Sequence, residues 1–483
     1  SAKPDPCTDH RSTYRIARWR SQPMARHHRR RKTSPLTKRR LARSGNGTRH
    51  RHRTIRPTRL RRADARFPIR TSNGKSVCGT IKHRRRMLYA MESMGHRTFI
   101  HHHPNHFITD TNMRILALTA ALLLPLAAHA ECGGSFNSFK NGLKSEAVAQ
   151  GISPAKADAF LSGIRKDGSV LKADRAQGVF QKPFIEFSRR LISSNRINSG
   201  RSNAKRFDRV FDNVESTYGV NRNVLLAFWA FETDYGAFQG DFNTANALVT
   251  LAHDCRRPEL FRPQVFAAMT LYERGQFDPA RTTGAWAGEI GMVQMLPRDI
   301  LENGVDADGD GRVSLKTSAP DALTSGGKML QHLGWNAGQP WLQEVTVPNN
   351  MDWSKSGLGT TMSVGDWQAM GIRAREGKLA NLPASLILPQ GHKGPAFLAY
   401  PNFNVYFEWN QSFTYVLTAA YFATRLQGAS AYDAGNPDQG LQGDSMKRLQ
   451  SKLQKRGYNV GKIDGSLGAR TRDAVQAEQQ RLG

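Results

Sequence analysis

Positive charge is concentrated in the first quarter of this 483-residue chain. Residues 1–112 contain 29 Lys and Arg against 5 Asp and Glu, and so carry +24 of the formal net charge of +31. The same segment contains 11 of the 15 His and almost no apolar periodicity, so it cannot bury enough surface to offset the entropy lost on ordering its backbone. We therefore expect residues 1–112 to be a disordered basic leader or not to be translated at all. Any folded core should lie in the rest of the chain.

The segment that starts at Met113 has the layout of a secretory signal peptide. Arg114 gives a short positive start, an apolar run follows, and small residues precede a predicted cleavage after Ala130. The run is too short to span a bilayer as a mature helix. Residues 113–130 therefore predict an exported, periplasmic protein without a stable membrane anchor. Because an export signal acts at an N-terminus, the simplest interpretation of residues 1–112 is an over-extended reading frame. The alternative, a nucleic-acid-binding tail, lacks interleaved aromatic side chains that stack on bases, so we expect no nucleic-acid partner.

Two of the four cysteines, Cys132 and Cys255, follow the predicted signal peptide. Export places them in an oxidising compartment, where an even pair far apart in sequence favours a single disulfide. In the chain-entropy model a loop of this length gains about 4 to 5 kcal/mol of stability from the bond. The alternative is a pair of buried free thiols.

The chain beyond the signal peptide divides into two helical parts. Apolar residues recur mostly at three- and four-residue intervals, so residues 131–426 are expected to form one mainly helical domain. A stretch rich in Gly, Pro, Asn and Ser predicts a linker over residues 427–440. Residues 441–483 show two helical patterns joined by a Gly-rich turn. So short a unit should need its neighbour or its ligand for stability.

An apolar run from Asn223 to Gly236 predicts a buried helix that ends in a glycine turn, with Glu232 near its C-terminal end. Apolar surroundings and the negative end of the helix dipole both disfavour a carboxylate. Both would therefore raise the pKa of Glu232 toward the range of a general acid. The same spacing also fits a Glu232 that points to water at a frayed helix end.

Three motifs resemble, in the same order, those of the lytic murein transglycosylase B family, which is glycoside hydrolase family 103. The helix ends in Glu-Thr-x-x-Gly, residues 287–297 read Ala-Gly-Glu-Ile-Gly-Met-Val-Gln-Met-Leu-Pro, and residues 402–415 contain Asn-Phe and Trp-Asn-Gln-Ser-Phe-Thr-Tyr. Residues 449–475 resemble the small helical peptidoglycan-binding domain of cell-wall hydrolases. The resemblance implies a mainly α, lysozyme-like (α+β) catalytic domain followed by a helical peptidoglycan-binding module.

The family resemblance also implies an enzyme, a peptidoglycan lytic transglycosylase that cleaves the bond from N-acetylmuramic acid (MurNAc) to N-acetylglucosamine (GlcNAc). Glu232 would protonate the bridging oxygen and then take the proton of the muramic acid C6 hydroxyl, whose attack on C1 gives 1,6-anhydro-MurNAc. No cofactor is needed for catalysis, and a monomer acting on peptidoglycan glycan strands is expected. The implied substrate-binding residues are Gln294 and Asn410, which would hydrogen-bond the sugar, and Trp286, Trp409 and Tyr415, which would offer flat faces to its rings.

The sequence departs from the family pattern at two points. Ala285 stands where relatives often have Ser, and Trp409 replaces the usual Tyr. These departures suggest, as one alternative, a non-catalytic cell-wall-binding protein. Glu289 lies inside the second motif, and we expect it to be a solvated surface residue or a salt-bridge partner. As a second acid it would permit the other alternative, a hydrolytic lysozyme-like muramidase.

Residues 306–314 have the spacing of an EF-hand loop. The predicted oxygen ligands are Asp306, Asp308 and Asp310, followed by the backbone carbonyl of Arg312. The twelfth position is Thr317, which has no carboxylate, and the family resemblance implies Asp321 as a later ligand. We expect a structural Ca²⁺ site of modest affinity, and the alternative is a metal-free turn.

Overall fold

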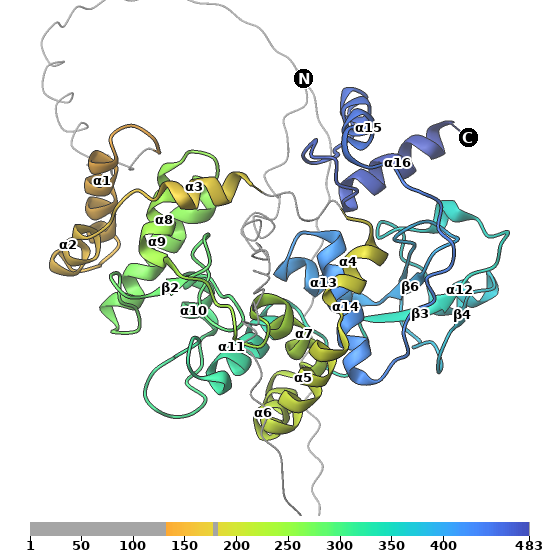
Figure 1. The fold of residues 1–483 in the computed structure, drawn as a ribbon, viewed down its shortest axis with the longest axis horizontal. Coiled ribbons are helices and arrows are strands. Elements are labelled where there is room, and N and C mark those ends of the chain that lie inside the picture. Colours follow the sequence, from red (N-terminus) through yellow and green to blue (C-terminus); the bar gives the residue numbers. More distant parts are fainter. Residues whose placement is uncertain (1–131, 177–181, 483) are drawn as a thin grey trace, which may run out of the picture. The chain divides into compact units, whose positions relative to one another are not determined.

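The computed structural model describes residues 132–176 and 182–482, and most of these residues lie in helices (Figure 1). The predicted leader (1–112) and signal peptide (113–130) lie outside the described residues. Within those residues, no helix combines the length and the apolar character needed to cross a membrane.

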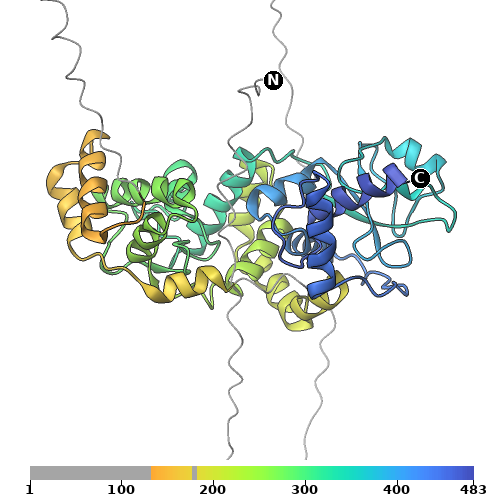
Figure 2. The same cartoon turned by 90° about the horizontal axis from the view of Figure 1, so that it is seen from above.

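One group of helices packs around the first described residues. It consists of α1 (Phe136–Ala149), α2 (Pro154–Ser162), α3 (Gly168–Arg175), α8 (Thr244–His253) and α9 (Pro258–Glu273). Helices α1 and α2 lie side by side in both views (Figures 1 and 2). Proline at the start of α2 and α9 suits a first helical turn, where no backbone N–H is needed. A disulfide joins Cys132 to Cys255, with Cα atoms 5.1 Å apart, and so ties the chain ahead of α1 to the segment between α8 and α9.

A second group of helices packs around α7 (Arg222–Thr233) and around its neighbours α11 (Ala319–His332) and α14 (Phe413–Gln427). Its other members are α4 (Phe184–Leu191), α5 (Ser194–Arg206), α6 (Asp208–Tyr218), α10 (Pro297–Asn303) and α13 (Pro401–Trp409). Every residue of α7 from Val224 to Phe231 is buried, in agreement with the helix predicted from the apolar run. Helix α7 packs against α14, α5, α11 and α6, so its C-terminal end is fixed from several sides.

Two small antiparallel sheets interrupt the helices. Strands β1 (Phe242–Asn243) and β2 (Thr283–Gly284) form a pair. The larger sheet has the order β4-β3-β6-β5, with β3 (Leu342–Thr346), β4 (Arg373–Ala374), β5 (Ser385–Ile387) and β6 (Ala396–Ala399). Together with α12 (Val364–Ala369) and the 3₁₀ turn Trp353–Lys355 it encloses a separate apolar cluster around the fully buried Trp367.

The C-terminal module consists of α15 (Gly443–Lys455) and α16 (Ala469–Leu482) around a small apolar core. The carboxamide of Gln450 closes the loop between the helices: its Oε1 accepts from Gly465 N at 2.9 Å and its Nε2 donates to Ser466 O at 3.0 Å. The module also contacts its neighbour, as its small core predicts. The partly buried Arg472 guanidinium donates to Pro389 O at 2.6 Å and lies 4.6 Å from the ring centre of Phe413.

Candidate active site

Glu232 lies in the last turn of α7, just before a sharp reversal of the chain. Asp234 and Tyr235 have positive φ values of 51° and 61°, which non-glycine residues rarely adopt. Side-chain contacts to α5 hold this reversal: Arg196 Nε donates to Asp234 Oδ1 at 2.9 Å, and Tyr235 Oη donates to Arg196 O at 2.8 Å. Backbone strain that the surroundings maintain is a common property of functional sites.

The Glu232 carboxylate is half-buried and is held by two neutral donors. Trp409 Nε1 donates to Glu232 Oε1 at 2.8 Å, and Tyr415 Oη donates to the same oxygen at 2.9 Å. Both hydrogen bonds favour the charged form of Glu232, whereas burial and the C-terminal end of α7 favour the neutral form. The side chain therefore does not point freely to water, which was the alternative expected for a frayed helix end.

The three aromatic residues predicted to offer flat faces to sugar rings are buried instead. Trp409 and Tyr415 have no exposed surface, and Trp286 is 3% exposed. Trp409 stacks on Phe228 at 4.3 Å between ring centres, and α14 packs along the same helix, α7. The prediction of sugar stacking by these rings is thus wrong for this structure. The polar atoms of Trp409 and Tyr415 contact Glu232.

Gln294 belongs to a loop that is tied to the end of α7. Thr233 Oγ1 donates to Met292 O at 2.7 Å, and it accepts from Gly236 N at 2.8 Å. Gln294 itself has a φ of 54°, and its Nε2 donates to Gly291 O at 2.8 Å. The second motif is thereby placed beside Glu232, although the Gln294 side chain is mostly engaged by the loop.

Asn410 connects α13 to α14. It is 2% exposed, and its Oδ1 accepts from Ser412 N at 2.8 Å. This contact shapes the turn that leads into the first residues of α14, where Tyr415 reaches Glu232. A role for Asn410 in sugar binding stays a prediction.

Glu289 is buried, 2% exposed, so the prediction of a solvated surface residue is wrong. It lies close enough to Arg257 for their charges to interact, and Arg257 also donates to Asp174. Burial lowers the pKa of Arg257, while the charges of Asp174 and Glu289 act in the opposite direction. Glu289 thus belongs to a buried charge cluster.

An exposed aromatic side chain near Glu232 was missed by the motifs. Phe238 is 69% exposed, and its backbone N–H donates to Thr233 O at 2.9 Å. The chain reversal after α7 therefore presents an aromatic ring to solvent six residues beyond Glu232. No sequence motif indicated this ring, because the exposure of a side chain in a turn depends on how the turn packs.

The acidic loop brings three exposed carboxylates together. Oxygen atoms of Asp306, Asp308 and Asp310 lie within 4.8 Å of one another. Hard oxygen donors at this spacing suit Ca²⁺. Asp321 is fully buried and has a different position: it accepts from Ala307 N at 2.9 Å and from Ser314 N at 2.8 Å, which ties both ends of the loop together.

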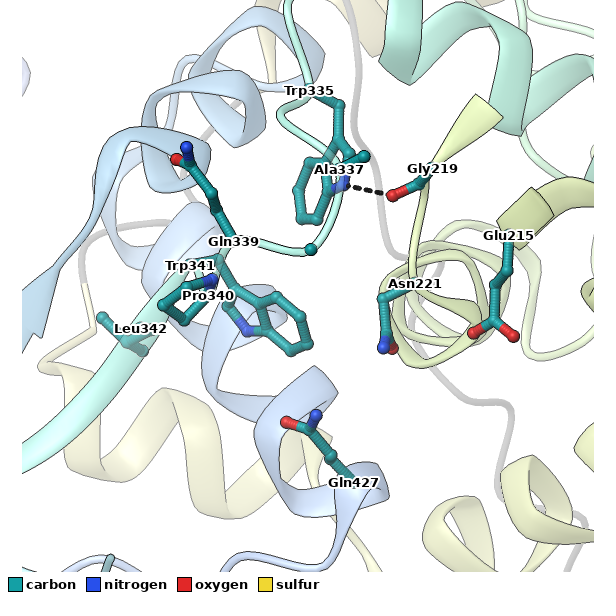
Figure 3. A pocket seen from close by; sticks show the side chains of 11 residues that line it. Glu215, Gly219, Asn221, Trp335, Ala337, Gln339, Pro340, Trp341, Leu342 and Gln427 are labelled. Carbon is teal, nitrogen blue, oxygen red and sulfur yellow. Dashed lines mark hydrogen bonds between the residues drawn. The ribbon is translucent and has the colours of Figure 1, made fainter. Parts of the chain in front are cut away.

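A pocket of about 400 Å³ lies at the opposite end of α7 from Glu232 (Figure 3). Trp341 and Asn221, the N-cap of α7, face each other across it, and Trp335 Nε1 donates to Gly219 O at 3.0 Å. None of the residues predicted to act on substrate lines this pocket.

Two family models match the chain. The model described as transglycosylase SLT domain matches residues 135–424, which is more than half of the chain, and the putative peptidoglycan binding domain matches residues 442–483. The chain belongs to the transglycosylase SLT domain family. The family and fold that the motifs implied are confirmed, and with them the enzyme class, a lytic transglycosylase.

Three relatives illustrate the range of this SLT family. SltB3 from Pseudomonas aeruginosa, solved in complex with NAG-NAM-pentapeptide, is 34% identical with a TM-score of 0.66, and the match covers 73% of this chain and 96% of that one. Membrane-bound lytic murein transglycosylase B of Escherichia coli K12 is 23% identical over 311 residues, covering 61% of this chain and 85% of that protein. Escherichia coli Slt35, solved in complex with calcium, is 22% identical with a TM-score of 0.53, covering 62% and 96%.

Proposed function

We propose that this enzyme is an exported lytic transglycosylase that cleaves the MurNAc-GlcNAc β-1,4 bond of peptidoglycan and leaves 1,6-anhydro-MurNAc ends. The observation that carries the proposal is the single half-buried Glu232, held on one oxygen by Trp409 and Tyr415. Structures of the relative SltB3 with NAG-NAM-pentapeptide and with NAG-anhNAM-pentapeptide support it.

The contacts of Glu232 suggest which oxygen carries the proton. Oε1 accepts two hydrogen bonds, so the acidic proton of the neutral side chain resides on Oε2. Oε2 gives this proton to the bridging oxygen as the C1 bond breaks, and the carboxylate then takes the proton of the C6 hydroxyl as that oxygen bonds to C1. Glu232 ends protonated as it began, and no water enters the product. The tethered hydroxyl replaces the second carboxylate of ordinary glycosidases.

Substrate contacts in this proposal come from residues around Glu232. Gln294 and Asn410 are proposed to hydrogen-bond the sugar, and the exposed ring of Phe238 is the aromatic surface beside the acid. Replacing Phe238 by Ala should raise KM several-fold without lowering the melting temperature, because an exposed ring contributes little to folding. An unchanged KM would remove Phe238 from the substrate-binding set.

Export and domain layout are part of the same proposal. Residues 113–130 would direct the chain to the periplasm, residues 131–426 would form the transglycosylase domain, and residues 441–483 would bind peptidoglycan beyond the 427–440 linker. Mass spectrometry of the exported protein should find Glu131 or a near neighbour as its first residue. Peptides from residues 1–112 on that protein would contradict the proposed start.

The acidic loop is proposed to bind a structural Ca²⁺. Asp306, Asp308 and Asp310 would supply carboxylate oxygens and Arg312 a backbone carbonyl, while Asp321 shapes the loop or joins the ligands once the ion is bound. The relative Slt35 was solved with calcium, which supports this assignment. The ion would stabilise the loop, and no catalytic step calls for it.

The test of the proposed function is the Glu232→Gln variant. It keeps the size of the side chain and its ability to accept from Trp409 and Tyr415, but it cannot donate and recover a proton. Digestion of purified sacculi should stop, while the melting temperature and pelleting with sacculi stay unchanged. Undiminished turnover by this variant would refute the assignment of the acid. Sacculus binding without turnover by the unmutated protein would favour a non-catalytic wall-binding protein.

A further inference from the structure

The ammonium group of Lys316 is held by two neutral oxygens of β2. Lys316 Nζ donates to Thr283 O at 2.8 Å and to Thr283 Oγ1 at 2.5 Å. In the part of the chain that the structure describes, Lys316 forms no ion pair. Its side chain is partly buried, and burial lowers the pKa of Lys316. A partly buried cation without a counterion is costly, which makes the position suited to an anionic ligand.

Short hydrogen-bonded steps connect Lys316 to the catalytic helix. Thr233, next to Glu232, donates to Met292 O, and Met292 N donates to Leu315 O at 2.9 Å. Lys316 follows Leu315 directly. Gly291 packs against Leu315 so closely that an added Cβ would lie 2.5 Å from Leu315 Cβ, so this connection has little freedom to move.

A second path leads from Lys316 to the loop of Gln294. Gln239 Nε2 donates to Lys316 O at 3.0 Å, and Gln294 Nε2 donates to Gln239 O at 3.4 Å. Gln239 follows the exposed Phe238. Lys316 is therefore embedded in the same set of segments that carries the proposed sugar contacts, on the side where β2 pairs with β1.

The chemistry of the substrate suggests the anion. The glycan strand itself is uncharged apart from the muramic acid side chain, whose carboxyl is used up in the amide to the peptide stem. The stem peptide carries free carboxylates, and the relative SltB3 was solved with a pentapeptide-bearing disaccharide. On the basis of the proposed function, we propose that Lys316, positioned by Thr283, binds a carboxylate of the peptide stem and makes the enzyme prefer peptide-bearing glycan.

The proposal predicts a selective loss of activity in the Lys316→Met variant. On peptide-bearing strands kcat/KM should fall about tenfold, the effect expected for one lost hydrogen bond between charged groups. On the same strands with the stem carboxylates amidated, so that the stem stays but its negative charge is removed, kcat/KM should stay unchanged. Lys316→Arg should restore most of the preference, because the charge is kept. Lys205→Met, which removes an exposed lysine of α5, is the matched control and should leave both activities unchanged.

Binding separates this proposal from the proposed function. Calorimetry with the inactive Glu232→Gln protein measures the binding of two ligands: a disaccharide-peptide with free stem carboxylates, and the same compound with those carboxylates amidated. The Glu232→Gln protein should bind the free carboxylates roughly tenfold more tightly, and adding Lys316→Met should abolish this preference. If Lys316→Met lowers kcat/KM equally on both kinds of strand, Lys316 has a purely structural role and the proposal is overturned. Equal binding of both disaccharide-peptides by the Glu232→Gln protein with Lys316 intact would also overturn the proposal. Failure of the proposed function would instead appear as absent turnover of both strands by the unmutated enzyme.

Discussion

Trp409 is the residue at which the structure most changes the interpretation of the sequence. Its ring was expected to face sugar, but it is fully buried against Phe228 and its indole N–H donates to Glu232. An aromatic residue at the end of a helix can serve as core or as binding surface, and only the packing of elements far apart in sequence decides between them. Trp409 and Glu232 are 177 residues apart.

The Trp409→Phe variant should shift the pH dependence of the enzyme. It keeps an aromatic ring against Phe228 but removes one donor to Glu232 Oε1. Because that donor stabilises the carboxylate, its loss favours the neutral form of Glu232 and should raise its pKa. In the proposed mechanism Glu232 starts protonated, so activity should persist to higher pH, and the alkaline limb of kcat/KM should move upward.

The control for this experiment is Trp341→Phe. It removes another buried indole donor, from Trp341 Nε1 to Ala420 O, at the end of α7 away from Glu232. It should lower the melting temperature without moving the alkaline limb. A limb that stays in place in Trp409→Phe, or moves downward, would mean that this hydrogen bond does not tune the acid.

At the scale of elements, the sequence predicted helices well and contacts poorly. The apolar run of α7 and the turn at Gly465 follow from local rules, because apolar spacing and glycine φ angles act within a few residues. The burial of Glu289 and the exposure of Phe238 depend on how the loops fold back on α7 and α9, which no local pattern encodes. Asp321 was predicted as a ligand, yet in this structure its oxygens accept backbone N–H groups of the acidic loop.

The acidic loop gives an element-scale prediction. Three carboxylates crowd one turn, so a divalent cation that binds only the folded state should raise the melting temperature. Thr317 offers no carboxylate, so the affinity should be modest, about 0.1 to 1 mM as in extracellular Ca²⁺ modules. Thermal melting with millimolar Ca²⁺ and with EDTA measures the effect, and the double variant Asp308→Asn, Asp310→Asn should abolish it. If Ca²⁺ does not change the melting temperature of the unmutated protein, the loop is an ordinary turn and not a metal site.

At the scale of the whole molecule, specific side-chain contacts join the C-terminal module to the catalytic domain. The partly buried Arg472 places its guanidinium against the ring of Phe413, the first residue of α14, while Gln476 Nε2 donates to Ser356 O at 2.7 Å. Helix α14 is also the element that brings Tyr415 to Glu232. The peptidoglycan-binding-like module and the transglycosylase domain are therefore in direct contact within one compact unit.

The origin of the oxygen in the product tests the central claim most directly. Purified sacculi are digested in water enriched in ¹⁸O, with the Glu232→Gln variant as the blank, and the new glycan ends are analysed by mass spectrometry. If Glu232 works as a single acid and base and the C6 hydroxyl attacks C1, the new ends are 1,6-anhydro-MurNAc, one water lighter than reducing ends and free of ¹⁸O. Reducing ends that contain one ¹⁸O would show that water is the nucleophile, and they would contradict the account.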